Sequence, residues 1–494
     1  MLIIGRMEDQ PAESKWRILL VASEAAPYAK AGGLGDVVSG LAKALHERGH
    51  DVRIVMPLYR SIDRARHGIE YVGNLCTHFG RGEELWCGVH EGLLDSRVPV
   101  VFLDYGRFFD RSGIYDDGAR EYGDNAYRFT FLSKAAMQWC KDRAWIPDVI
   151  HVHDWQTAVL PVLLRTWDRV LSPMSQSATV LTIHNIGYQG VYTPEVMDFM
   201  GLGPEHFNPD TFEDHGRLNL LKAGIRYADA ITTVSPTHAH ELLDTIGGCG
   251  LAPYLGRRQA DLHGILNGAD YELWNPAADP MIAKPFDGGH LEGKALCRKN
   301  LRDHFGLEDN GTPILGIVSR LVEQKGMGIM RGMLEAAVRH CAIQVVVLGT
   351  GDPAAHAFFD DLARRYPGRV GVHIGFSNEL SHRIYAGSDF FFMPSLYEPC
   401  GLSQMYAMKY GSLPVVRATG GLADTVRDGQ TGLLFTQPDA GDAYHAIERM
   451  VRLWYDRPEE YRRMQETAMA VRFTWEQSVR EYESVYAGVI SRYR

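Results

Sequence analysis

Short runs of β-branched and other apolar residues alternate along the chain with stretches in which apolar residues recur at helical spacing. This alternation predicts parallel strands with helices packed against them. The first such unit comprises a strand at 16–22, a glycine-rich loop, a helix that Asp36 is expected to cap, and a strand at 51–56. Further strands are predicted at 98–103, 148–153, 178–184, 230–234, 263–266, 314–318, 344–348, 369–374, 390–393 and 413–416.

A stretch without clear periodicity divides these strands into two series. Residues 268–294 are rich in Pro, Gly, Asp and Asn, a composition typical of a linker between domains. We therefore expect two doubly wound, Rossmann-like α/β domains, one at 17–267 and one at 295–473, with 1–16 as an N-terminal extension. Open sheets of this kind bind ligands at the carboxyl ends of their strands, so two that face each other would enclose a central cleft.

The chain ends in a predicted helix over 474–494. It opens with the capping-box pattern Thr474-Trp-Glu-Gln477, in which the first and fourth residues satisfy each other's backbone N–H groups. An apolar stripe at helical spacing comprises Trp475, Val479, Tyr482, Tyr486 and Val489. Such a helix should pack against one of the domains.

Composition narrows the class of protein. With 494 residues, 45% hydrophobic and 23% charged, the chain is typical of a soluble globular protein and unlike a disordered or collagen-like one. Its formal net charge of −10 disfavours nucleic acid or an anionic membrane as a partner. No apolar run approaches the roughly 20 residues of a membrane span, and the first residues turn polar too soon for a signal peptide. Seven scattered cysteines without C-x-x-C spacing are typical of reduced thiols, so we expect a cytoplasmic enzyme.

The first predicted strand is followed by the loop Lys30-Ala-Gly-Gly-Leu-Gly-Asp36. Consecutive glycines let backbone N–H groups approach an anion, and the N-terminus of the following helix and Lys30 add positive charge. The loop is not the dinucleotide motif G-x-G-x-x-G, because Val38 stands where the last glycine would be, and it lacks the Lys-Ser/Thr of a Walker A loop. It is either a phosphate-binding loop or an ordinary glycine-rich turn.

Two further loops follow strands of the second series. Arg320 and Lys325 could bind a diphosphate, Arg320 through its planar guanidinium and Lys325 through its ammonium group. They could also be an ordinary basic pair on the surface. Glu398 precedes Gly401 and a new helix, so it could accept hydrogen bonds from sugar hydroxyls, although a lone loop glutamate is usually just solvated. The segment 419–421, Thr-Gly-Gly, should offer another pair of exposed N–H groups.

Histidines follow two strands of the first series. His151 and His153 share a strand face, but the sequence lacks convincing further ligands nearby and lacks a D-x-D pair, so we expect no metal. His184 ends another strand beside glycine-rich backbone. It is either a buried, hydrogen-bonded histidine or a group that stabilises charge in a transition state.

Taken together, these motifs resemble the bacterial glycogen synthase and plant starch synthase family. The matches run in the family's order from about residue 17 to the end of the chain. They are the Lys-x-Gly-Gly-Leu loop at 30–34, His153-Asp154-Trp155, His184-Asn185 with Gln189-Gly190, Leu266-Asn267-Gly268, Arg320 with Lys325, and the stretch 398–421.

The resemblance implies a two-domain glycosyltransferase of the GT-B type. Such enzymes transfer glucose from ADP-glucose to the 4-hydroxyl at the non-reducing end of glycogen or a linear α-1,4-glucan. They retain the configuration of the sugar and need no metal or other cofactor. In this family the C-terminal helix returns to the N-terminal domain, which would give the stripe of the 474–494 helix its partner.

The resemblance also implies roles for individual residues. The expected catalytic residues are Glu398, which should hold the glucose hydroxyls, His184, and the diphosphate-binding Arg320 and Lys325. The expected donor-binding residues are Lys30, Gly32, Gly33, Asp36, Asn267, Phe376, Cys400, Gly401, Leu402, Ser403, Gly420 and Gly421. Phe376 is expected to stack on adenine, and Lys30 with the backbone of Gly32 and Gly33 to close over the phosphates. The expected acceptor-binding residues are Tyr115, Asp154 and Trp155.

The chemistry can also be argued from the residues. Retention by double displacement needs a nucleophile and an acid/base partner, whereas only Glu398 is well placed. The alternative is attack on the same face, in which the leaving diphosphate takes the acceptor proton and Arg320 and Lys325 neutralise it. Many retaining relatives carry a second glutamate eight residues after the first, but here that position is Tyr406, which favours the starch and glycogen synthases.

Other functions stay open or are disfavoured. A retaining transferase with another nucleotide sugar or acceptor is the main alternative, and the residues alone do not decide between ADP and UDP. A glucan phosphorylase lacks support from a lysine context for pyridoxal phosphate, and an NAD-dependent oxidoreductase lacks its glycine motif. A glucan-binding pseudoenzyme should have lost Lys30, Arg320, Lys325 or Glu398, but the sequence contains all four residues.

Cys400 beside Glu398 either makes activity sensitive to thiol reagents or is a packed small residue.

Overall fold

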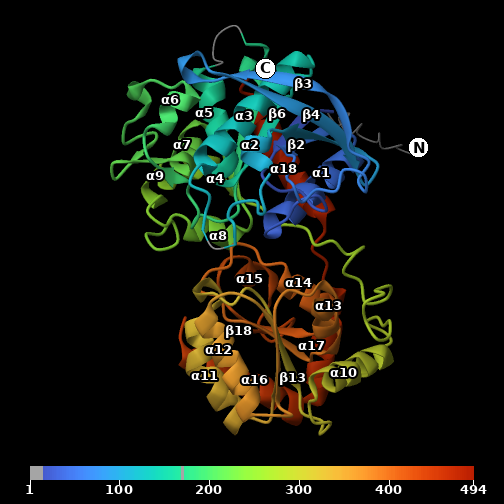
Figure 1. The fold of residues 1–494 in the computed structure, drawn as a ribbon. Helices are drawn as coiled ribbons and strands as arrows, with labels where there is room; N and C mark the ends of the chain where they lie inside the picture. The colour runs from blue at the N-terminus through green and yellow to red at the C-terminus, as the bar shows by residue number, and fades with distance from the viewer. Residues whose placement is uncertain (1–14, 119, 168–171, 494) are drawn as a thin grey trace, which may run out of the picture. The chain divides into compact units, whose positions relative to one another are not determined.

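The computed structural model describes residues 15–118, 120–167 and 172–493 as two compact α/β units (Figure 1). The first unit comprises the described residues of Met1–Leu181, Tyr188–Ala230 and Glu483–Arg494. The second comprises Thr182–Gly187 and Ile231–Tyr482. This architecture confirms the prediction of an α/β protein with two doubly wound parts.

The larger sheet has nine strands in the order β12-β11-β7-β6-β1-β2-β5-β4-β3. Neighbouring pairs β1–β2, β1–β6, β2–β5 and β11–β12 are parallel, whereas β3, β4 and β5 form an antiparallel edge. Its strands are β1 (Arg17–Val21), β2 (Asp51–Pro57), β3 (Glu70–His78), β4 (Glu84–Leu94), β5 (Val98–Asp104), β6 (Val149–His153), β7 (Ala178–Ile183), β11 (Ala230–Thr233) and β12 (Leu262–Gly264). A separate small sheet contains β8 (Val191–Tyr192), β10 (Arg217–Asn219) and β9 (Glu213–Asp214).

The first helix forms as the hydrophobic pattern predicts, but with a different cap. Helix α1 (Gly33–Glu47) buries Val37, Val38 and Leu41 on one face. Its N-cap is Gly32, so the prediction that Asp36 caps the helix is wrong. Asp36 lies in the first turn instead, where its negative charge is stabilised by the helix dipole. The other helices of this unit are α2 (Gly106–Phe109), α3 (Asn125–Asp142), α4 (Asp154–Thr157), α5 (Val159–Thr166), α6 (Val196–Met200) and α7 (Leu220–Tyr227).

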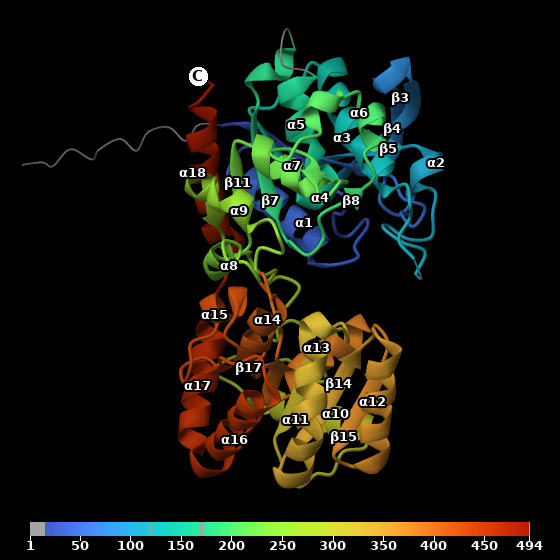
Figure 2. The same ribbon diagram turned by 90° about the vertical axis from the view of Figure 1, so that its left-hand side faces the viewer.

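The second unit contains a six-stranded parallel sheet in the order β15-β14-β13-β16-β17-β18. Helices lie on both sides of it (Figure 2). The strands are β13 (Ile314–Val318), β14 (Gln344–Gly349), β15 (Val370–Ile374), β16 (Phe390–Met393), β17 (Leu413–Arg417) and β18 (Leu433–Phe435). From β13, the strands β14 and β15 are added on one side of the sheet. The chain then crosses to the other side of β13, where β16, β17 and β18 follow in order. This is the Rossmann strand order, whose switch point lies between β13 and β16.

The helices of the second unit are α8 (Pro236–Glu241), α9 (Ala252–Gly256), α10 (Glu292–Phe305), α11 (Met327–His340), α12 (Pro353–Arg365), α13 (Asn378–Gly387), α14 (Ser403–Lys409), α15 (Gly420–Thr425), α16 (Ala440–Asp456), α17 (Pro458–Ala470) and the first part of α18 (Trp475–Ile490). Of these, α11, α12, α14, α16 and α17 contribute residues to a core rich in Leu, Ile, Val and Phe. In the described residues, no helix is long and apolar enough to span a membrane.

The last helix, α18, buries Val479, Tyr482, Tyr486 and Val489 of the predicted stripe, whereas Trp475 is only partly buried. Within the first unit, Tyr486 donates or accepts a hydrogen bond with His151 Nδ1 at 2.8 Å, and Glu483 accepts one from Arg48 Nε at 2.6 Å. At its start, the N–H of Gln477 donates to Thr474 Oγ1. Because the compact units divide α18 after Tyr482 and place β12 with the second unit, their bounds differ from the predicted domains. The domain boundaries and the hinge at 268–294 stay predictions.

Candidate active site

The site is built on the two loops that leave the sheet of the second unit at its switch point. The loop after β13 carries Arg320 and ends in a short 3-10 turn, η5 (Glu323–Lys325). Gly326 then adopts a left-handed conformation, with φ of +79°, and a Cβ atom there would lie 2.1 Å from the carbonyl oxygen of Pro394. Only glycine allows the loop after β13 to lie this close to the loop after β16.

A cavity of about 210 Å³ opens between these loops. Its polar lining includes Ser319, Arg320, Lys325, Ser395 and Ser403. Two of these side chains are cations and none is a carboxylate. The cavity therefore suits a ligand with negative charge.

Lys325 and Glu398 form the central ion pair of the site. Lys325 Nζ donates to Glu398 Oε2 at 2.5 Å, and Ser395 Oγ donates to the same oxygen at 2.9 Å. Glu398 is only 6% exposed, so its charge depends on these partners. The structure thus joins two predicted catalytic residues that are 73 positions apart in the chain.

The loop that carries Glu398 is held by its neighbours. Arg417, at the end of β17, donates from Nε to the carbonyl oxygen of Ser395 at 2.7 Å and also donates to that of Leu396. The N–H of Leu396 in turn donates to the carbonyl oxygen of Gln324 at 2.9 Å. These bonds satisfy backbone groups that would otherwise be free and so fix the position of the carboxylate.

Arg320 and Phe376 lie in more exposed positions. Arg320 lines the cavity, and its guanidinium donates to Gln324 Oε1 at 2.9 Å. Phe376 lies between β15 and α13, and its ring is 89% exposed. An exposed ring of this kind is available for stacking, but the lining of the cavity does not include it, so its contact with adenine stays a prediction.

The segment 400–403 connects Glu398 to the N-terminus of α14. Gly401 has a left-handed φ of +70°, and Leu402 is the N-cap of α14 without a capping bond from its side chain. The first N–H groups of this helix therefore lie beside Ser403, at the wall of the cavity. Their partial positive charge adds to that of the two cations.

Cys400, the first residue of this segment, is buried, and so is Asn267. Burial raises the pKa of Cys400 to about 12, although hydrogen bonds from Asn267 act in the opposite direction. The thiol is therefore protonated at neutral pH. This favours the interpretation of Cys400 as a packed residue over that of a reactive thiol.

Gly420 and Gly421 do not offer exposed N–H groups, so that prediction is wrong. The N–H of Gly420 donates to Glu241 Oε1 at 2.9 Å, and the N–H of Gly421 donates to the carbonyl oxygen of Glu398 at 3.0 Å. The sequence gives no local sign of Glu241, which approaches from α8. A role of these glycines in donor binding stays a prediction. Either Glu241 would have to release the N–H of Gly420, or the glycines would contribute only by allowing the backbone to pack closely.

His184 lies at the carboxyl end of β7. Burial lowers the pKa of His184 to about 3. The ring is therefore neutral at physiological pH and can donate a hydrogen bond. A role of His184 in stabilising transition-state charge stays a prediction, and it would have to act through that hydrogen bond. Next to it, Asn185 Oδ1 accepts from the N–H of Gly187 at 3.0 Å and shapes the turn.

The glycine-rich loop of the first unit is organised around a carboxylate that the sequence analysis missed. Glu24 Oε2 accepts from the N–H groups of Ala31 and Gly32 at 2.7 and 3.1 Å, and Tyr115 donates to Glu24 Oε1 at 2.5 Å. The amide of Gly32 is therefore not free to close over a phosphate. Lys30 pairs with Asp36 at 2.6 Å, and Lys30 and Tyr115 both line a cavity of about 420 Å³. The position of Glu24 just after β1 was the signal that could have identified it.

Asp154 and Trp155 begin α4 and are buried. Trp155 is 5% exposed and packs edge-on against Phe129, with ring centroids 5.4 Å apart. Gly190 lies against its face, where a Cβ atom would come within 2.4 Å of the indole. Trp155 thus has little free surface for a sugar, and contact of these residues with the acceptor stays a prediction.

Comparison with known proteins places these features in a family. The family model "Starch synthase catalytic domain" matches residues 17–257, and the model "Glycosyl transferases group 1" matches residues 300–471. The chain is 44% identical over 489 residues to glycogen synthase 1 of Geobacter metallireducens, covering 97% of each chain. The chain belongs to the glycogen synthase and starch synthase family. It is also 41% identical to the glycogen synthase of Treponema denticola, over 96% of this chain and 99% of the relative.

Solved structures agree with this family and show the fold. The catalytic domain of starch synthase IV from Arabidopsis thaliana, bound to ADP and acarbose, superposes with a TM-score of 0.89 at 34% identity. It covers 97% of this chain and 100% of that one. Sucrose-phosphate synthase from Thermosynechococcus elongatus, at 19% identity and a TM-score of 0.62, shares the fold. This glycogen synthase family member is thus a glycosyltransferase of the GT-B type.

The burial of Cys400 predicts that this thiol reacts slowly. We expect iodoacetamide to modify the exposed Cys249 well before Cys400, and activity to persist while Cys249 is being modified. Peptide mass spectrometry over a time course measures both rates. Cys87 is the matched control, because it is buried and burial also raises its pKa to about 12. Equal modification of Cys400 and Cys249 in the native protein would show that the thiol is accessible.

The low pKa of His184 predicts that its ring does not titrate in the working range. We expect His184→Gln to lower kcat/KM without changing the shape of its pH profile between about pH 5 and pH 8, because the wild-type ring stays neutral there. Steady-state kinetics of both proteins across this range provide the measurement. If an ionisation near the ordinary histidine pKa disappears in the variant, His184 is protonated during catalysis.

Proposed function

We propose that this protein transfers glucose from ADP-glucose to the non-reducing-end 4-hydroxyl of an α-1,4-glucan with retention of configuration. The observation that carries the proposal is the cavity at the switch point, which is lined by Arg320 and Lys325 and by no carboxylate. Family membership supports a nucleotide sugar as donor and a glucan as acceptor. The starch synthase IV structure, bound to ADP and acarbose, supports ADP as the nucleotide.

The diphosphate of the donor would be held by charge at the cavity. The ammonium of Lys325 has three N–H donors, and the bond to Glu398 uses one of them. The others can donate to phosphate oxygens, together with the fork of Arg320 and the N-terminus of α14. Glu398 fixes Lys325 in place, and we propose that it also accepts hydrogen bonds from the hydroxyls of the transferred glucose.

A single carboxylate favours attack on the same face of the sugar. Double displacement needs a second carboxyl group, but Tyr406 is stacked on Trp274 with ring centroids 4.3 Å apart, and the cavity lining includes no Asp or Glu. In our proposal, the bond between the anomeric carbon and the diphosphate oxygen breaks first. The acceptor 4-hydroxyl then attacks from the same side and transfers its proton to the departing oxygen. Arg320 and Lys325 stabilise the negative charge that develops on the diphosphate.

The first unit carries Lys30 and the predicted acceptor-binding residues Tyr115, Asp154 and Trp155. Lys30 and Tyr115 line its own cavity, where a polyhydroxylated or anionic ligand would find a charged and a hydroxyl group. We propose the glucan acceptor for this unit, with Tyr115 held in place by Glu24.

The donor assignment is tested by measuring glucose incorporation into glycogen from ADP-glucose and from UDP-glucose in parallel, with EDTA present. We expect robust incorporation from ADP-glucose that EDTA does not reduce. Incorporation only from UDP-glucose would overturn the donor assignment but leave the diphosphate site intact. Incorporation from neither donor would contradict the acceptor assignment or the enzymatic function itself.

The role of Lys325 is tested by Lys325→Ala. Loss of one electrostatic stabiliser of the transition state should lower kcat about 10²–10³-fold. Steady-state kinetics with ADP-glucose give the values, and a thermal unfolding curve shows whether the fold is retained. Lys299→Ala is the matched control, because Lys299 is an exposed lysine of the same unit that pairs with Asp303 at 2.7 Å. Normal turnover in Lys325→Ala would refute the assignment.

A further inference from the structure

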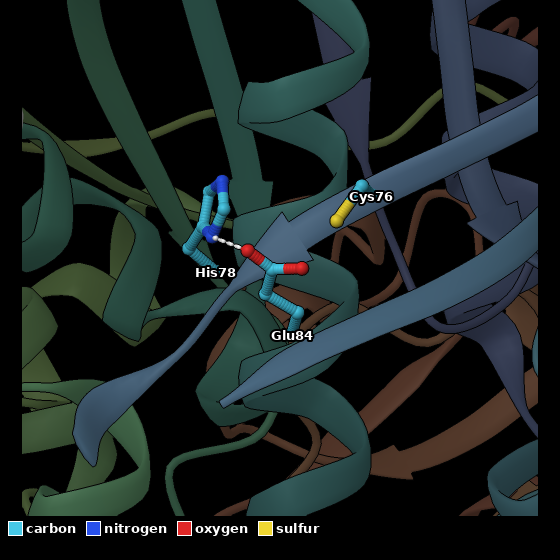
Figure 3. A group of neighbouring side chains, drawn as sticks. All are labelled: Cys76, His78 and Glu84. Atoms are coloured by element: carbon cyan, nitrogen blue, oxygen red, sulfur yellow. Dashed lines mark ion pairs between the residues drawn. The ribbon is translucent and has the colours of Figure 1, made fainter. Parts of the chain in front are cut away.

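Three side chains with metal-binding atoms converge on the hairpin formed by β3 and β4. Cys76 and His78 are two residues apart on β3 and therefore point to the same face of the sheet. Glu84 lies on β4 directly opposite His78 in the strand register. Figure 3 shows the sulfur of Cys76 and the imidazole of His78 directed toward the carboxylate of Glu84.

The distances between these three side chains suit the binding of one metal ion. One donor atom from each of Cys76, His78 and Glu84 lies within 4.8 Å of the other two. His78 Nδ1 and Glu84 Oε1 are 3.4 Å apart. In a tetrahedral zinc site with bonds of about 2.0–2.3 Å, neighbouring ligand atoms lie roughly 3.3–3.8 Å apart. Small rotations of these side chains are therefore sufficient, and His78 and Glu84 are exposed enough to make them.

The backbone of the hairpin is already fixed at this point. The strands are joined by the short turn η1 (Gly80–Gly82), across which the N–H of Phe79 donates to the carbonyl oxygen of Glu83 at 2.8 Å. Phe79 is buried and stacks on Phe199, with ring centroids 4.3 Å apart. A Cβ atom on Gly80 would collide with the backbone of Asp198, so the turn is tightly packed. Binding would therefore cost little ordering of the chain.

The donor set selects the class of metal. Mg²⁺ and Ca²⁺ prefer oxygen ligands only, whereas a thiolate, an imidazole and a carboxylate together suit Zn²⁺. Three protein ligands leave a fourth position for water. We propose that Cys76, His78 and Glu84 form a zinc-binding site that links β3, the edge strand of the nine-stranded sheet, to β4. On binding, the S–H bond of Cys76 breaks, a Zn–S bond forms, and the proton passes to the solvent.

The proposed zinc site shares no residue with the donor and acceptor sites proposed above. None of the three residues lines either cavity with a predicted catalytic or binding residue. Its metal would stabilise the hairpin and would leave transfer from ADP-glucose in EDTA unaffected. The inference does not rest on the proposed function, and its failure would leave that function untouched.

Cobalt provides a direct readout, because a thiolate ligand gives Co²⁺ an intense near-ultraviolet charge-transfer band. We expect the protein, freed of metal by dialysis against chelator, to bind one equivalent of Co²⁺ with this band, and Zn²⁺ to displace it. Cys76→Ser should abolish the band, and His78→Ala or Glu84→Gln should weaken binding at least about 10-fold. A spectrum without the band, or one that Cys76→Ser does not change, would overturn the proposal.

Two matched controls separate this site from adventitious binding. Cys249→Ser removes an exposed thiol far from Cys76 in the sequence, and His290→Ala removes another exposed histidine that pairs with a carboxylate, Asp287, at 3.2 Å. Both variants should bind Co²⁺ as the wild type does. Zn²⁺ should also raise the Tm of the wild type and both controls but not that of Cys76→Ser. Equal loss of binding in a control variant would assign the metal to scattered surface groups and contradict the site.

Discussion

The ion pair between Lys325 and Glu398 is the interaction on which the arrangement of the cavity at the switch point depends. It joins the loop after β13 to the loop after β16, the two connections that the Rossmann strand order brings to the switch point. Glu398 is almost fully buried, so its negative charge would be destabilising without the positive charge of Lys325 beside it. Gly326 permits the close approach of the loops, and Arg417 satisfies the carbonyl groups of the loop that carries the carboxylate. The pair thus fixes a cation at the wall of the cavity in which we propose that the diphosphate binds.

The strands of the parallel sheets could be predicted from the sequence, because buried parallel strands are short apolar runs between turns. β13 and β14, for example, lie where the runs at 314–318 and 344–348 predicted them. The antiparallel strands β3 and β4 were missed. Trp86 is 63% exposed and Tyr71 58%, so polar and apolar residues on these two strands do not alternate cleanly.

The candidate site was predictable where a motif lies at the end of a strand. The partners that come from distant parts of the chain were not. Glu241 reaches Gly420 from α8, and Glu24 reaches Gly32 across the loop, and both occupy amides that a glycine-rich motif alone suggests are open. A motif shows that a backbone can approach an anion. It does not show which anion the folded chain already provides.

The stack of Tyr406 on Trp274 limits how this active site can be redesigned. Trp274 is sandwiched between Tyr406 and His382, whose ring centroids lie 4.3 and 3.9 Å from that of the indole. A carboxylate introduced at position 406 would replace one ring of this sandwich with a charge that is buried among apolar and aromatic residues. The pair of glutamates that many retaining transferases carry therefore cannot be introduced by this one substitution alone. To introduce this pair, a designer would first have to replace the aromatic residues that pack around position 406.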